Sequence, residues 1–290
     1  MKKIFIYFFL ISSNLYSQTN YEYFGALKLN GNDASIITYR ITFTEAKGAI
    51  KGYSITDIGG KHETKNVIEG FYNKKTKVLT FKELNVLYTK SPLSKDVFCF
   101  VNFSGKVKLI NDNSKLEGDF KGLYKNNLKC IDGTLLLIGS NKLYKFLNKI
   151  NTKIQTSKKI DAKTKEKVNP IAVFDSLKVN TLTKNQNLNV FVSSNELELE
   201  VWDAKIEDGD RIDLYQNGKK ILDNYTVLNK KRKITIKLDA DTNIFKIVAL
   251  NEGERTLNTA MILIIDKERT FELETNLKKG ENTSITVIKN

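Results

Sequence analysis

The chain has 290 residues, 28% of them charged, and a formal net charge of +14. This length predicts about two domains. One histidine and two cysteines exclude a disulfide-dense scaffold and a Cys/His zinc cluster. The positive charge is unevenly placed, because residues 147–187 hold nine basic and three acidic groups whereas residues 188–290 hold 16 and 18.

Residues 1–17 are predicted to be a secretory signal peptide. Lys2 and Lys3 precede an apolar run, residues 4–11, that is too short to span a membrane, and Ser17 offers a small residue for cleavage. A buried N-terminal strand is the alternative. No later segment approaches 18 uninterrupted apolar residues. We therefore expect an exported soluble protein, periplasmic or extracellular, without a transmembrane span.

Residues 18–150 are predicted to form a β-domain ending in a short helix. Segments rich in β-branched and aromatic residues alternate with turn residues such as Gly31-Asn32 and Lys47-Gly48. Their regular spacing favours an antiparallel β-barrel or sandwich. The predicted strands include residues 35–43, 77–81, 96–103 and 106–110.

Four short motifs repeat in this domain, each with a glycine after a charged residue. The glycines are Gly52, Gly70, Gly118 and Gly133. A glycine inside a strand permits a sharp bend or a close approach of backbones, and closed barrels use such bends. The pattern is loosely similar to the calycin barrels, avidin and lipocalin, without their diagnostic motifs. It leaves open a solid β-core and a cup for a small apolar ligand.

The segment after the last predicted strand of this domain is rich in lysine. Residues 141–150 carry an apolar stripe at helical spacing, which predicts one amphipathic helix, packed on the barrel or lying on a membrane surface. Residues 151–170 are predicted to be a polar, lysine-rich linker or a loosely helical spacer that ends at Pro170. In an exported protein, the partners expected for the lysines of this segment are lipid head groups, anionic glycans or another envelope protein, and not specific nucleic acid. These lysines are Lys153, Lys158, Lys159, Lys163, Lys165 and Lys167. A solvated spacer is the plain alternative.

Residues 171–290 are predicted to form an immunoglobulin-like β-sandwich of about seven or more strands. Asn217-Gly218 separates two apolar segments by two residues, which is the signal of a tight hairpin. The predicted strands are residues 188–192, 196–202, 211–216, 233–238, 244–250, 260–266 and 284–289. Together with the preceding segments they give an all-β fold class.

Three segments of this C-terminal part carry a family resemblance: residues 201–225, 248–253 and 258–264. They are similar to a recurring β-sandwich module at the C-terminus of uncharacterised secreted proteins from gliding Gram-negative bacteria. Prolines precede the Asn-Thr-Ala of that module, whereas Arg255, Thr256 and Leu257 stand there in this chain. The resemblance implies secretion and an accessory or binding role, and it brings no catalytic residues.

Few residues point to chemistry. Cys99 and Cys130 could close a disulfide in an oxidising compartment, or remain buried thiols. His62 opens a zincin-like HETKN segment, but Asn66 stands where the second zinc-binding histidine is needed. The best carboxylates for a glycosidase are scattered, at Glu63, Glu69 and Glu83. We therefore expect no enzymatic activity.

Residues 201–225 hold the remaining candidates. Strand parity places Trp202 with Glu198 and Glu200 on one face, where its ring could stack on a sugar or cover the edge of the sandwich. An EF-hand is excluded, because Ala204, Ile206 and Tyr215 occupy ligand positions. Two alternatives are left open. Asp203, Asp208 and Asp210 could bind calcium in a looser arrangement, or Asp208-Gly209 is simply a turn.

The predicted function is that of an exported, non-enzymatic binding or interaction protein. A small-molecule-binding calycin-like barrel is the first alternative. A carbohydrate-active enzyme with two carboxylates is the second. Calcium is the only cofactor that the sequence suggests.

Overall fold

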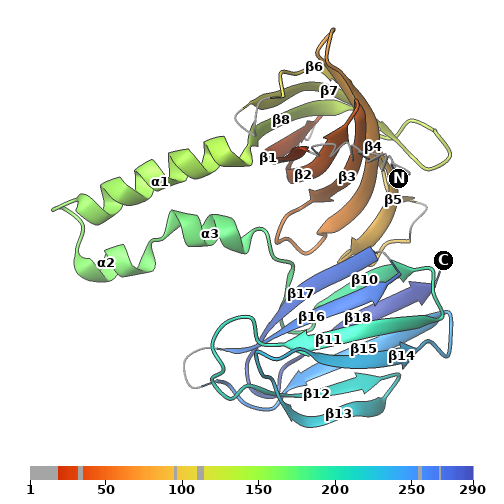
Figure 1. The fold of residues 1–290 in the computed structure, drawn as a ribbon, viewed down its shortest axis with the longest axis vertical. Helices are drawn as coiled ribbons and strands as arrows, with labels where there is room; N and C mark the ends of the chain where they lie inside the picture. Colours follow the sequence, from red (N-terminus) through yellow and green to blue (C-terminus); the bar gives the residue numbers. More distant parts are fainter. Residues whose placement is uncertain are drawn as a thin grey trace, which may run out of the picture.

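The computed structural model describes residues 19–31, 35–94, 97–109, 114–253, 257–267 and 269–289. The fold is all-β, with an N-terminal barrel, a helical segment and a C-terminal pair of packed sheets (Figure 1). The predicted signal peptide lies outside the described residues. Among the helices that are described, none has the length and apolar character needed to cross a membrane.

Eight antiparallel strands form the barrel. β1 pairs with both β2 and β8, and β5 pairs with β6, so the sheet closes on itself. The strands are β1 (Thr19–Leu29), β2 (Ile36–Ala46), β3 (Ala49–Thr56), β4 (Thr64–Asn73), β5 (Val78–Thr89), β6 (Phe100–Lys106), β7 (Lys115–Leu123) and β8 (Gly133–Gly139). The prediction of a strand over residues 106–110 was wrong for residues 107–109, which form no strand because β6 ends at Lys106, and residue 110 lies outside the described residues.

Alternate residues of these strands fill the barrel. Tyr23, Tyr39 and Phe43 are at most 1% exposed and belong to one core cluster. Gly52 and Gly70 also occupy inward positions, because their strand neighbours two residues away are buried. A side chain at Gly52 would overlap the backbone of Thr42, and one at Gly70 would overlap Thr80. The predicted close approach of backbones at these glycines is confirmed.

Three helices separate the barrel from the sandwich: α1 (Ser140–Thr156), α2 (Ala162–Lys167) and α3 (Pro170–Ser176). α1 runs away from the barrel, while α2 and α3 return toward the sandwich (Figure 1). We name residues 140–177 the helical arm. The predicted helix over 141–150 is present but longer, and the segment predicted as a linker or loosely helical spacer is largely helical. Asp161 caps α2 by accepting from the backbone N–H of Thr164 at 2.9 Å.

Pro170 begins a helix instead of marking the end of a linker. The Asn169 side chain accepts from the N–H groups of Ile171 and Ala172, and Pro170 occupies the first turn of α3, where its missing N–H costs nothing. Phe174 of α3 packs edge-on against Phe24 of β1, with ring centroids 4.7 Å apart. This contact fixes the returning end of the arm to the barrel.

The C-terminal part has two layers of five strands each, and the first layer belongs to the 13-stranded sheet that also includes the barrel strands. One has the order β13-β12-β15-β18-β10 and the other β14-β11-β16-β17-β9. The strands are β9 (Thr181–Leu182), β10 (Asn187–Val192), β11 (Glu196–Trp202), β12 (Arg211–Gln216), β13 (Lys219–Thr226), β14 (Arg232–Lys237), β15 (Thr242–Ala249), β16 (Asn258–Asp266), β17 (Arg269–Leu277) and β18 (Asn282–Lys289). Side chains of both sheets share one core. This is a β-sandwich.

The predicted hairpin turn joins β12 to β13. Asn217 and Gly218 both have positive φ, 50° and 85°, as a type I′ turn requires. β17 was not predicted, although it pairs with β16 along its whole length. Its sequence, RTFELETNL, alternates apolar and polar residues but has few β-branched ones.

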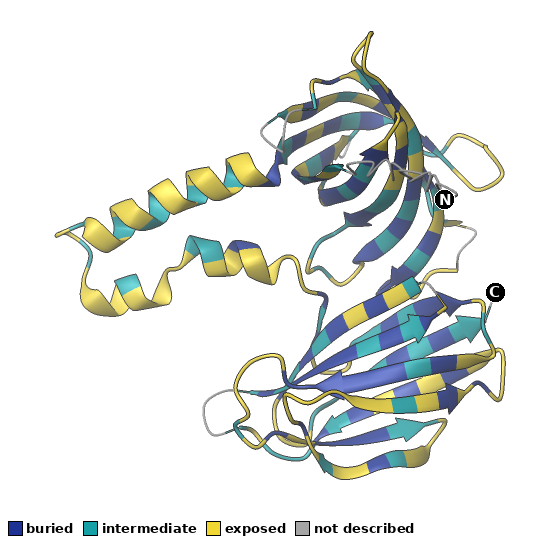
Figure 2. Cartoon of the chain, viewed as in Figure 1, coloured by how far each residue is buried: buried dark blue, intermediate teal, exposed yellow. Residues whose placement is uncertain are grey.

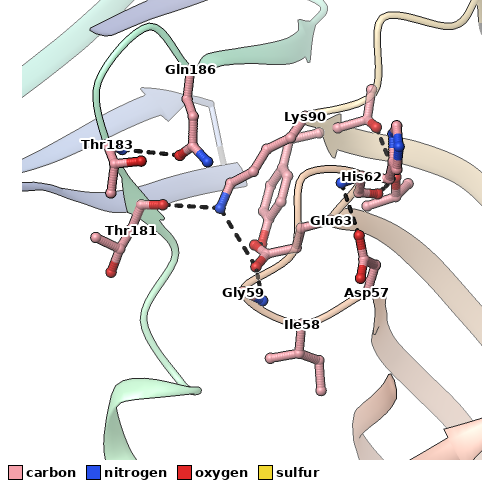
Figure 3. A network of polar contacts seen from close by, with 12 residues as sticks. Asp57, Ile58, Gly59, His62, Glu63, Lys90, Thr181, Thr183 and Gln186 are labelled. Carbon is pink, nitrogen blue, oxygen red and sulfur yellow. Dashed lines mark hydrogen bonds and ion pairs between the residues drawn. The ribbon is translucent and has the colours of Figure 1, made fainter. Parts of the chain in front are cut away.

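The barrel and the sandwich share a sheet. Near its end β5 pairs with β10, with Thr89 opposite Asn189 and Tyr88 opposite Val190. The ammonium of Lys90 donates to the backbone oxygen of Thr181 at 2.9 Å (Figure 3). These contacts join the two parts directly, in addition to the helical arm.

Candidate functional site

The three aspartates of the predicted calcium site meet at one end of the sandwich. They lie in the loop between β11 and β12, where Gly209, with a φ of 85°, reverses the chain between Asp208 and Asp210. One oxygen from each of Asp203, Asp208 and Asp210 lies within 4.8 Å of the other two. Two oxygens that bind one Ca²⁺ at about 2.4 Å are at most about 4.8 Å apart, so the spacing fits that ion.

Backbone hydrogen bonds hold both ends of this loop. Asp203 donates its N–H to the oxygen of Leu228, and Val227 donates to the oxygen of Asp210, both at 2.8 Å. The Asn229 amide donates to the oxygen of Asp203 at 2.8 Å. The carboxylates are therefore positioned by the segment that follows β13.

Two of the three aspartates are buried and Asp208 is partly exposed, and the cluster has no cation of its own among the described residues. Asp203 and Asp210 are 3% and 0% exposed, and no described lysine or arginine forms an ion pair with the three. Burial, and after it the charges of Asp208 and Asp203, raise the pKa of Asp210. Thr259 donates its N–H to Asp210 Oδ2 at 2.7 Å, but Oδ1 has no described partner. Calcium binding stays a prediction, which this geometry supports.

Trp202 lies beside this loop and under a lysine. The indole is 9% exposed, and Lys231 Nζ lies 4.3 Å from the centre of its ring. The same ammonium pairs with Glu200 Oε2 at 2.7 Å. The predicted strand parity is confirmed, since Leu197 and Val201 face the core. The face of Trp202 that could stack on a sugar is occupied by Lys231.

Cys99 and Cys130 form a disulfide, with their Cα atoms 6.0 Å apart and a sequence separation of 31. It joins the start of β6 to the connection between β7 and β8.

Removing the disulfide with Cys99→Ser and Cys130→Ser is expected to lower the free energy of unfolding by about 3 to 4 kcal/mol. The reason is that the unfolded chain gains conformational entropy when a loop of this length is no longer closed by the disulfide. Urea unfolding measures the change. Reduced wild type should match the variant, and equal stability of oxidised wild type and the variant would contradict the expectation.

The candidate carboxylates of the barrel do not face each other. Glu83 points into the barrel, where it accepts from Tyr39 Oη at 2.9 Å, from Val101 N–H at 2.7 Å and from Ser54. Burial raises the pKa of Glu83, and these donors offset part of that rise. Glu69 is exposed on the strand surface.

Glu63 belongs to a different network, between the barrel and the sandwich (Figure 3). It accepts from Tyr88 Oη at 2.9 Å and from the N–H of Gly59 at 2.6 Å, and it lies 3.6 Å from Lys90 Nζ. Both charged side chains are 3% exposed. His62 is exposed, and its backbone N–H donates to Asp57. Glu63 is thus held by structural contacts. Among the described residues, no second candidate carboxylate lies opposite it.

The helical arm presents a basic surface. It contains nine lysines and three acidic residues, and eight of the lysines are exposed. Figure 2 shows that most of the arm is exposed, apart from the contacts between its helices. Large apolar side chains are exposed beside the lysines: Tyr144, Phe146, Val168, Val173 and Leu177.

An apolar groove runs between the helices of the arm. It encloses about 540 Å³ and is lined by residues of α1 and of the segment from Lys167 to Leu177. Phe146 and Val173 are 59% and 62% exposed. Exposed apolar groups rimmed by charge are typical of an interaction surface.

A second, open pocket of about 870 Å³ lies on β4 to β8 of the barrel. Its lining combines exposed polar residues such as Lys82 and Lys121 with the phenylalanines Phe71, Phe81, Phe103 and Phe120. Phe81, Phe103 and Phe120 are also members of the barrel core. The described interior of the barrel is otherwise occupied by side chains.

Comparison of the chain with models of protein families, with curated proteins and with solved structures finds no match.

Proposed function

We propose that this chain is an exported, non-enzymatic interaction protein that docks on an anionic lipid surface through its helical arm. One observation carries the proposal. The arm extends from the body of the molecule with an excess of six positive charges, and it exposes aromatic and aliphatic groups among them.

Charge and apolar surface act together in such docking. A lysine near an anionic lipid surface contributes about 1 kcal/mol, and this attraction weakens as salt screens it. Phe146 shares a face of α1 with Lys142, Lys145 and Lys149, so it can enter the interface between head groups and acyl chains. Tyr144, two residues away, lies on another face of the helix.

The sandwich has the accessory role in this proposal. Its two packed sheets and its tight β12–β13 hairpin support an immunoglobulin-like arrangement, and its resemblance to a module of secreted proteins supports export. The calcium loop would stiffen the end of the sandwich where β11 and β12 meet.

A small-molecule-binding, calycin-like barrel is the second candidate. The pocket of about 870 Å³ favours it, because its volume is within the range of ligand sites and phenylalanines form part of its wall. The proposal of a carbohydrate-active enzyme has less support, since Glu63 and Glu83 are held in separate networks.

Sedimentation with lipid vesicles tests the docking proposal. Wild type should bind phosphatidylglycerol vesicles at low ionic strength, bind neutral phosphatidylcholine vesicles weakly, and dissociate as salt is added. Replacing Lys142, Lys145, Lys149 and Lys153 by glutamine should weaken binding about tenfold or more.

The matched control replaces four exposed lysines of the barrel by glutamine: Lys51, Lys82, Lys106 and Lys121. It removes the same charge and should retain most of the binding. Equal losses in the two variants, or equal binding to neutral vesicles, would overturn the role of the arm. Tighter binding to heparin than to anionic vesicles would replace lipid with an anionic glycan.

A further inference from the structure

A small pocket lies where the barrel, the end of the arm and the sandwich meet. It measures about 300 Å³, which is roughly the volume of ten water molecules. Barrel strands β2 to β5 supply one wall, residues 177–180 another, and Met261, Thr270 and Glu272 of the sandwich a third. Pockets of this kind between domains are common ligand sites.

An unpaired buried amide lines this pocket. Asn180 is 7% exposed, and neither its Nδ2 nor its Oδ1 has a hydrogen-bond partner among the described residues. A buried amide that lacks partners costs about 1 to 3 kcal/mol. A ligand with polar atoms would supply the missing hydrogen bonds.

Two cations face the same pocket. Lys65 Nζ lies 3.8 Å from the ring centre of Tyr53 and forms no ion pair with any described carboxylate. Arg40 is paired with Glu22 and also donates to the backbone oxygen of Lys178. Burial, and after it the charge of Arg40, lower the pKa of Lys65 to about 8. The other charged or titratable groups near the pocket are Glu63, Tyr88, Lys178 and Glu272.

The charges of Glu272 and Glu63 favour the protonated form of Lys65, but neither carboxylate forms an ion pair with it. Glu63 already accepts from Tyr88 and Gly59 and is paired with Lys90 (Figure 3). The ring of Tyr88, together with Ile55, Val179 and Met261, supplies the apolar part of the lining, whereas Lys65 covers a face of the Tyr53 ring. The pocket therefore offers one free ammonium, one free amide and a surface for a small hydrophobic body.

We propose that this pocket binds a small organic carboxylate, with its charged group on Lys65 and Asn180 and its apolar part against Tyr88 and Met261. The size of the pocket limits the ligand to about the size of a benzoate ion. This site is independent of docking by the arm. It needs no membrane and uses none of the lysines of the arm.

NMR titration of the full chain tests the proposal, with benzoate, 4-hydroxybenzoate and hexanoate as probes and their neutral amides as controls. At least one carboxylate should shift the side-chain signals of Lys65 and Asn180 with millimolar affinity, and its amide should not. Lys65→Met should weaken binding about tenfold to a hundredfold, because a hydrogen bond to a charged group is lost. Lys61→Met, an exposed change outside the pocket, should have no effect.

The titration of Lys65 supplies a second measurement on the same samples. The bound carboxylate should raise the pKa of Lys65 from about 8, so affinity should fall as the pH rises above that value. Asn180→Leu should weaken binding while the free protein loses no stability, because the unpaired amide is removed. Absence of shifts at Lys65 and Asn180 with all three probes, or equal binding by Lys65→Met, would overturn the proposal.

Discussion

Replacing Gly52 by alanine is expected to lower the free energy of unfolding of the barrel by about 3 kcal/mol or more. The added Cβ would overlap the carbonyl oxygen of Thr42 and lie 2.6 Å from the Cα of Phe43, on the paired strand β2. Backbone atoms of a closed sheet cannot move aside as a flexible side chain can. The strands would have to separate, with loss of the core contacts of Phe43.

Lys51→Ala is the matched control for this change. It alters the neighbouring residue of β3, which is exposed, and should change stability by less than about 0.5 kcal/mol. Urea unfolding followed by circular dichroism measures both variants. A Gly52→Ala protein as stable as Lys51→Ala would mean that β2 and β3 are farther apart than described.

Millimolar calcium is expected to raise the melting temperature by about 5 to 10 °C. If the dissociation constant is about 10 μM, 1 mM free calcium stabilises the folded state by about 2.7 kcal/mol. Each kcal/mol raises the melting temperature of a chain of this size by about 2 to 4 °C. The physical reason is that Asp203, Asp208 and Asp210 repel one another until a cation is bound.

Asp208→Asn separates this effect from general charge screening. The variant should lose most of the calcium response, and without calcium it should be at least as stable as wild type, because one repelling charge is gone. Asp223→Asn, an exposed change in the β13 strand, should keep the full response. No calcium shift in wild type, or the same shift in Asp208→Asn, would contradict calcium binding at this loop.

Local patterns in the sequence predicted much of this structure. Alternation along residues 196–202 placed Leu197, Leu199 and Val201 in the core, because parity alone decides which face of a strand is buried. Asn217 and Gly218 predicted their hairpin, because few other residues adopt positive φ at both positions. Asp203, Asp208 and Asp210 are close in sequence and share one loop, so their meeting could also be anticipated.

The helical arm shows where composition was too coarse a guide. Composition alone predicted a linker or a loosely helical spacer over residues 151–170, because they contain few large apolar groups. Two capping signals were present: Asp161 three residues before Thr164, and Asn169 directly before Pro170. These side chains satisfy N–H groups at the helix starts, which is why short polar helices form there.

The pocket between the two parts could not be predicted. Lys65, Asn180 and Glu272 are far apart in the chain, and nothing in their neighbours in sequence marks them. They come together because β5 of the barrel pairs with β10 of the sandwich. The sequence does not reveal which strand edges of the two sheets are exposed, and the pairing depends on those edges.

Tryptophan fluorescence tests the docking of the arm most directly. The chain has one tryptophan, Trp202, which is buried under Lys231, so a second one at an exposed position adds a separable signal. With anionic vesicles at low salt, Phe146→Trp should show a blue-shifted emission that reverses at high salt. Phe71→Trp, at a 52% exposed barrel position, should not shift. No shift at position 146, or equal shifts at both positions, would contradict docking through the arm.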